Sequence, residues 1–73
     1  MVFTPHKRTS LRERVLRDLR SAILRGALPA GERIYEGKIA EQMEVSRAPV
    51  REALMALQQE GLVTRIPNKG VFV

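Results

Sequence analysis

Apolar residues recur at intervals of three and four positions between residues 10 and 26, which predicts an amphipathic helix. Its inward stripe is predicted to comprise Leu11, Val15, Leu19, Ala22 and Ile23. Ser10 and Glu13 have the spacing of a capping box, in which each side chain accepts a hydrogen bond from a backbone N–H at the start of the helix. Gly26 follows the last periodic position, as expected for a left-handed C-cap.

A second, short helix is predicted over residues 36–43, because the segment has one small apolar face made by Ile39, Ala40 and Met43. The preceding segment, residues 33–35, is too short for more than a small edge strand, and we expect it to be extended. Glu44 and Val45 leave room only for a tight connection to the next helix.

The third predicted helix begins at Ser46 and ends before Gly61. We expect the Ser46 side chain to cap an amide two or three residues later, and Pro49 is tolerated because first-turn amides have no acceptor within the helix. At about 100° per residue, one stripe faces inward and consists of Val50, Ala53, Leu54 and Leu57. A separate outer ridge, at four-residue steps, consists of Arg47, Arg51 and Met55.

The pattern changes after Gly61 to a strand over residues 62–66, a tight turn over residues 67–70 and a second strand over residues 71–73. The order of three helices and a hairpin predicts an α+β, mainly helical fold, the winged helix-turn-helix. We expect one domain over residues 10–73, preceded by a flexible basic arm over residues 1–9.

Composition narrows the possible partners and activities. The 73 residues have a formal net charge of +5, which favours nucleic acid as the partner and an anionic membrane only as a second choice. The chain has no cysteine, one histidine and no pattern of catalytic side chains, so we predict no metal, no cofactor and no enzymatic activity. No apolar run is long enough to span a bilayer or to serve as a signal peptide, which predicts a cytoplasmic protein at the nucleoid.

Several linked motifs resemble the N-terminal domain of GntR-family bacterial transcription regulators. They are Leu-Pro-Ala-Gly-Glu-Arg-Ile (residues 28–34), Ile-Ala-Glu-Gln (39–42), Val-Ser-Arg-Ala-Pro-Val-Arg-Glu-Ala-Leu (45–54) and Glu-Gly-Leu-Val (60–63). The proline at position 49 is most similar to the FadR-type subgroup. The resemblance implies a winged helix that binds double-stranded operator DNA, usually within a repressor. It also implies a homodimer held by a C-terminal domain that senses a small-molecule effector, so this chain alone is expected to be monomeric.

The resemblance also implies roles for individual residues. Arg47 and Arg51 match the two arginines that contact guanines in the major groove. The positions against phosphate are Ser46, Ala48 and Pro49, and the wing tip consists of Asn68, Lys69 and Gly70. The chain departs from the FadR-type pattern near residues 36–38, where an arginine is common and Lys38 is expected to take its place at a phosphate.

Other interpretations of these residues stay open. Arg33 either contacts a backbone phosphate or lies along the surface of the first helix. Met55 either contacts a thymine methyl group or is merely exposed. Most arginines of the first helix are expected to face solvent, namely Arg12, Arg14, Arg17 and Arg20. As an alternative function, the outer ridge is the docking surface of a winged-helix module that binds protein or RNA.

Overall fold

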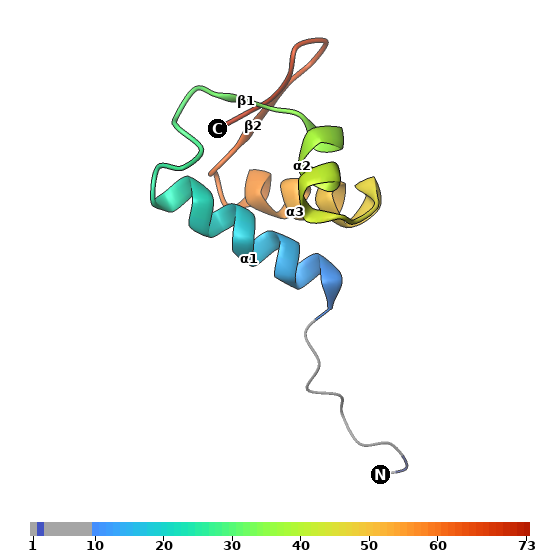
Figure 1. Ribbon diagram of the computed structural model, residues 1–73. Helices are drawn as coiled ribbons and strands as arrows, with labels where there is room; N and C mark the ends of the chain where they lie inside the picture. The colour runs from blue at the N-terminus through green and yellow to red at the C-terminus, as the bar shows by residue number, and fades with distance from the viewer. Residues whose placement is uncertain (1, 3–9) are drawn as a thin grey trace.

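The computed structural model describes residue 2 and residues 10–73, so the predicted arm over residues 1–9 lies outside the described residues except for Val2. The described residues form α1 (Leu11–Leu24), β1 (Arg33–Ile34), α2 (Glu36–Met43), α3 (Arg47–Gln59), β2 (Thr64–Ile66) and β3 (Gly70–Phe72). The three helices pack together, and the strands extend from them on one side (Figure 1). This arrangement confirms the predicted fold class, a winged helix-turn-helix.

The helix ends follow local sequence signals. Ser10 Oγ accepts a hydrogen bond from the Glu13 amide at 3.1 Å, which supplies the serine half of the predicted capping box. Gly26 follows α1 with a φ of +80°, which confirms the predicted left-handed C-cap. The turn between α2 and α3 is tight, as predicted. Glu44, which follows α2, adopts the left-handed conformation with φ at +57°.

The hydrophobic core lies where α1, α3 and the sheet meet. All four predicted inward residues of α3 are buried, and Leu57 and Val50 have no exposed surface. Leu11 was predicted to face inward, but this prediction is wrong, since 48% of its surface is exposed. Leu11 is the first residue of α1, and the inward stripe is buried only from Val15 onward.

The wing is a three-stranded sheet rather than a hairpin alone. The strand order is β1-β3-β2, with both pairs antiparallel, and Ile34 pairs with Val71 in the register. The extended segment before α2 therefore contains a short edge strand, which agrees with the prediction for this segment. Both residues of this pair belong to the core, so β1 fixes the start of α2 against the wing.

Arg20 was expected to face solvent, and its side chain is 37% exposed, but it also has a partner that the sequence did not indicate. Its guanidinium donates to both carboxylate oxygens of Glu60, from Nε at 2.8 Å and from Nη2 at 2.5 Å. Glu60 is the C-cap of α3, an end that disfavours negative charge, and Arg20 on α1 compensates for this. The hydrogen bond with Arg20 lowers the pKa of the Glu60 carboxyl below its usual range.

This pair gives a pH-dependent prediction for Glu60→Gln. Because the folded state lowers the pKa of Glu60, the pair stabilises the fold above the ordinary glutamate pKa of about 4.3 and loses this effect as the pH falls through the folded value. We expect the variant to melt at a lower temperature than wild type at pH 7, and the difference to shrink at about pH 3. Thermal unfolding followed by circular dichroism measures it, with Glu52→Gln on the same helix as a control. An equal difference at both pH values would contradict the assignment.

Candidate nucleic-acid interface

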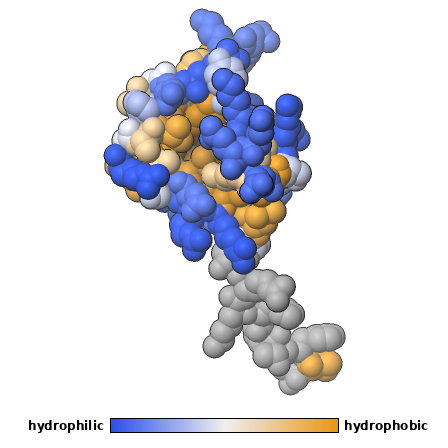
Figure 2. Space-filling view, in the orientation of Figure 1, coloured by the Kyte–Doolittle hydropathy of each residue, from blue (hydrophilic) through white to orange (hydrophobic). Residues whose placement is uncertain are grey.

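An open groove of 560 Å³ lies between the start of α2 and the wing. Four basic side chains line it, Arg33, Lys38, Arg47 and Arg65, against two carboxylates, Glu36 and Glu41. Hydrophilic side chains gather over α2 and the wing on the visible face (Figure 2). A concave surface with an excess of positive charge is the electrostatic pattern that attracts a polyanion.

The groove brings together residues that are far apart in the sequence. Arg33 comes from β1, Lys38 from α2, Arg47 from the first position of α3 and Gly70 from β3, so four of the predicted site residues lie around one concavity. Arg65 of β2 completes the set, although the sequence analysis did not single it out. The signal that could have identified it is its place in the strand beside the wing turn, where an exposed side chain can reach over the neighbouring strand.

Tyr35 is a second residue that the sequence analysis missed. Its ring centroid lies 4.8 Å from Arg33 Cζ and 5.3 Å from Lys38 Nζ, and 49% of the residue is exposed. Cations within about 6 Å of an aromatic face are attracted by the ring quadrupole. Tyr35 therefore contacts two cations of the groove, and neither of them has a carboxylate partner among the ion pairs of the described residues.

Two glycines of the groove lie directly beneath guanidinium groups. A Cβ added to Gly37 would lie 2.7 Å from Arg47 Nη2, and a Cβ added to Gly70 would lie 2.8 Å from Arg33 Nε. Both distances are shorter than real Cβ contacts allow, so any side chain at these positions displaces an arginine. Gly70 also has a φ of +118°, a backbone conformation that favours glycine.

The outer ridge of α3 is exposed as predicted, but one of its members is not free. Arg51 donates from Nη2 to Glu36 Oε1 at 2.9 Å and from Nε to Glu36 Oε2 at 3.3 Å. The hydrogen bonds and the charge of Glu36 raise the pKa of Arg51, which stays protonated. The partner is on another helix, α2.

The predicted side-chain cap of α3 is absent from the structure. Ser46 has the extended backbone of an N-cap, with φ at −74° and ψ at 169°, but its side chain makes no capping hydrogen bond. A serine N-cap bonds the amide of the second or third helical residue. The third residue here is Pro49, which has no N–H, so only the Ala48 amide is available. Ser46 and Ala48 are exposed and Pro49 is half-buried beside the groove end of α3.

The wing tip stands apart from the groove. Pro67 and Asn68 form a turn closed by a hydrogen bond of 3.0 Å from the Lys69 amide to the Ile66 carbonyl, and Asn68 has a φ of +65°. Proline followed by a residue with positive φ is the pattern of a type II turn. The loop between β2 and β3 points away from the helices (Figure 1), and Asn68 and Lys69 are exposed. Of the three predicted wing residues, only Gly70 lines the groove.

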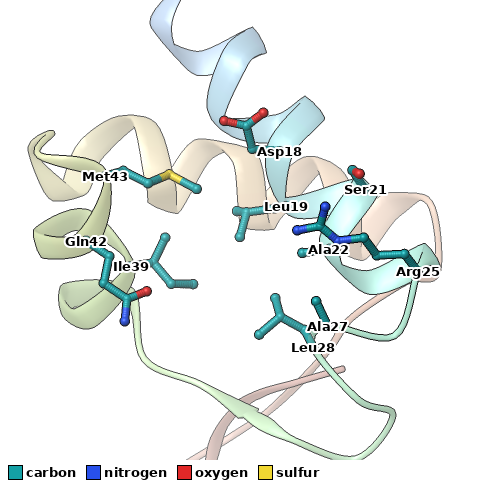
Figure 3. Close-up of a pocket in the computed structure, with 10 residues that line it drawn as sticks. All are labelled: Asp18, Leu19, Ser21, Ala22, Arg25, Ala27, Leu28, Ile39, Gln42 and Met43. Carbon is teal, nitrogen blue, oxygen red and sulfur yellow. The ribbon is translucent and has the colours of Figure 1, made fainter.

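A second hollow, of 390 Å³, lies between α1 and α2 and differs in chemistry. Leu19, Ala22, Leu28, Ile39 and Met43 point toward its centre, with Asp18, Ser21, Arg25 and Gln42 around the edge (Figure 3). Figure 2 shows it as an apolar area surrounded by hydrophilic side chains. With one basic and one acidic side chain, this hollow has no excess of positive charge, so the groove beside the wing is the better candidate for a polyanion.

The described residues contain neither a cluster of metal ligands nor a membrane-spanning helix. Within residue 2 and residues 10–73, no three histidine, cysteine or acidic side chains lie close enough together to bind a metal ion. No helix of that part of the chain has the length and apolar character needed to cross a bilayer. The groove therefore stays the strongest candidate site among the described residues.

Comparisons with known proteins agree with this geometry. The family model described as bacterial regulatory proteins of the gntR family matches residues 11–73. The chain is 46% identical over 66 residues to an HTH-type transcriptional regulator in an unstable DNA locus of Streptomyces ambofaciens, covering 90% of this chain and 28% of that protein. It is 38% identical over 66 residues to the gluconate operon transcriptional repressor of Bacillus licheniformis, covering 90% of this chain and 27% of the repressor.

Solved structures give the same result. The crystal structure of a putative GntR transcriptional regulator from Rhodococcus sp. RHA1 superimposes with a TM-score of 0.85 at 43% identity, covering 89% of this chain and 31% of that one. The chain thus spans about a third or less of the length of these relatives. The matched residues include α1, the helix-turn-helix and the wing, and the chain belongs to the GntR family of bacterial regulatory proteins, in which it forms a winged helix-turn-helix domain.

Proposed function

We propose that this chain binds double-stranded operator DNA with sequence preference, as the DNA-binding domain of a bacterial transcriptional repressor. The observation that supports this most directly is the position of Arg47 and Arg51. Both are exposed in the N-terminal half of α3, and Arg47 also lines the cationic groove beside the wing. The N-terminal end of a recognition helix is the part that approaches base edges in helix-turn-helix domains.

In this proposal the two kinds of basic residue do different work. Arg47 and Arg51 contact guanines, because a guanidinium can donate to O6 and N7 of the same base. Arg33, Lys38 and Arg65 contact the phosphate backbone. The contacts of Arg33 with Tyr35 and Gly70, and of Lys38 with Tyr35, hold these two side chains over the groove. Ser46, Ala48 and Pro49 approach a phosphate at the start of α3, where free amides and the helix dipole favour an anion. Asn68 and Lys69 reach the backbone or the minor groove from the wing tip.

The rest of the regulator is part of the proposal. A relative named as the gluconate operon transcriptional repressor supports repression, in which an occupied operator obstructs RNA polymerase in the cytoplasm. The relatives are about three times as long as this chain, which leaves room for a C-terminal domain that joins two copies and senses a small molecule. Alone, this chain is a weak monomeric binder, since joining two half-sites raises affinity by about 10²- to 10⁴-fold.

Selection from randomised duplex DNA at about 0.15 M salt tests the proposal, because binding that depends only on charge is weak at that salt concentration. We expect the 73-residue chain to enrich a short site that contains guanines. Enrichment of no site, with binding to duplex DNA only at low salt, would contradict it. Preferential binding to a single-stranded or structured RNA pool in the same assay would favour the RNA-binding alternative.

A further inference from the structure

The first turn of α2 contacts both arginines that the proposed function assigns to bases. Glu36 accepts two hydrogen bonds from Arg51, at 2.9 Å and 3.3 Å. The next residue, Gly37, lies under the Arg47 guanidinium, whose Nη2 would be 2.7 Å from an added Cβ. The ends of both α3 side chains are therefore placed by two consecutive residues of another helix.

We propose that Glu36 and Gly37 are positioning residues for sequence recognition. Glu36 fixes the orientation of the Arg51 guanidinium, and Gly37 provides the space that the Arg47 guanidinium occupies. This inference rests on the proposed function, because it concerns how the same two arginines reach bases. It assigns a role in base recognition to two residues that need not touch DNA themselves.

The chemistry of the guanidinium allows Arg51 to keep Glu36 while it binds a base. The group has five N–H donors, and Glu36 engages the edge formed by Nε and Nη2. The two N–H groups of Nη1 and the second N–H of Nη2 are not engaged by Glu36, and they form the end of the fork. That end fits O6 and N7 of guanine, so the two partners bind different edges of one planar group.

The pair also reduces the cost of ordering Arg51. A free arginine loses much rotamer freedom when it is fixed at an interface, and this loss opposes binding. The Glu36 side chain is only 24% exposed, compared with 57% for Arg51, so the carboxylate is the better-fixed member. A fixed carboxylate that orients Arg51 increases the preference for the correct site. A carboxylate that only competes with DNA for Arg51 would instead weaken binding to every sequence.

Glu36→Gln distinguishes these two roles. We measure the affinity of the 73-residue chain for the selected site and for a scrambled duplex by fluorescence anisotropy at about 0.15 M salt. Loss of a negative charge strengthens binding to both duplexes, so the readout is the ratio of the two affinities. We expect this ratio to fall by about tenfold, as Arg51 loses its fixed orientation. The control is Glu44→Gln, which removes the same charge at the opposite end of α2 and leaves the ratio unchanged.

A double-mutant cycle shows whether Glu36 acts through Arg51. In an Arg51→Ala background, Glu36→Gln is expected to change the ratio by less than about twofold, because the partner is already gone. An equal fall in that background, or an unchanged or higher ratio in the wild-type background, would overturn the role of Glu36. A wild-type chain that selects no site would instead overturn the proposed function, and this inference with it.

Gly37→Ala tests the second residue without weakening the fold. Alanine is the better helix former, and the added Cβ meets only the end of a flexible side chain, so we expect the thermal midpoint to stay the same or rise. The affinity ratio is expected to fall by about fivefold, an effect that disappears in an Arg47→Ala background. A stable variant with an unchanged ratio would overturn the role of Gly37.

Discussion

We expect Arg51→Ala to lower the affinity of the chain for its selected DNA site by about 5- to 150-fold, the range for loss of one bidentate arginine–guanine contact. Arg51 lies one turn after Arg47 on the exposed side of α3, and Glu36 holds its guanidinium. The fall should be largest for sites with the preferred guanine and small for scrambled duplex DNA. Anisotropy titrations with the selected site, its guanine-substituted versions and the scrambled duplex measure this difference.

Arg17→Ala is the matched control, because it removes the same charge from α1, which contributes no residue to the groove. It should weaken binding to all duplexes by a similar small factor through long-range attraction. An Arg51→Ala variant that behaves in the same way, with an equal loss for every sequence and a smaller salt dependence, would make Arg51 a phosphate contact and contradict direct base recognition.

Leu57→Ala is expected to have the largest effect on stability. Leu57 has no exposed surface and lies in the core where α3 packs. Removing a fully buried leucine side chain costs about 2–5 kcal/mol in the free energy of unfolding. Domains of this size have about 4–11 kcal/mol in total, so the variant loses much of its stability. We expect the thermal midpoint to fall by about 8–40 °C, measured by circular dichroism.

Leu24→Ala provides the control for this change, because the same side chain is removed from a residue that is 69% exposed. Such surface substitutions usually change the free energy of unfolding by less than about 0.5 kcal/mol. Similar midpoints for the two variants would contradict the placement of α3 in the core. Both experiments use the 73-residue chain in the absence of DNA, so that binding does not mask the loss of stability.

The helices and their inward faces follow from local sequence. Val50, Ala53, Leu54 and Leu57 repeat at helical spacing, and all four are buried. The same argument wrongly predicted that Leu11 is buried. Periodicity specifies which face of a helix is apolar, but not how much of that face the other elements cover. The prediction of a side-chain cap by Ser46 was also wrong, although the sequence shows that Pro49 removes one of the two amides that Ser46 could bind.

The candidate site was predicted in part. The motifs of residues 45–54 identified Arg47 and Arg51, and the structure confirms that both are exposed at the start of α3. Tyr35 and Arg65 were missed, because their place in the candidate site depends on which basic side chains lie beside them in the folded chain. Which of these residues touch DNA, and in which groove, stays a prediction for the experiments above.

The sequence by itself determined the order and type of the elements, the caps of α1, the inward stripe of α3 and the family, because these depend on residues close together in the chain. Only the tertiary structure decided the partners of the arginines. Arg51 meets Glu36 fifteen positions away, and Arg20 meets Glu60 forty positions away. A long charged side chain can reach several carboxylates, including those on nearby residues of its own helix. It pairs with the carboxylate that the packing of the helices brings closest to its charged group.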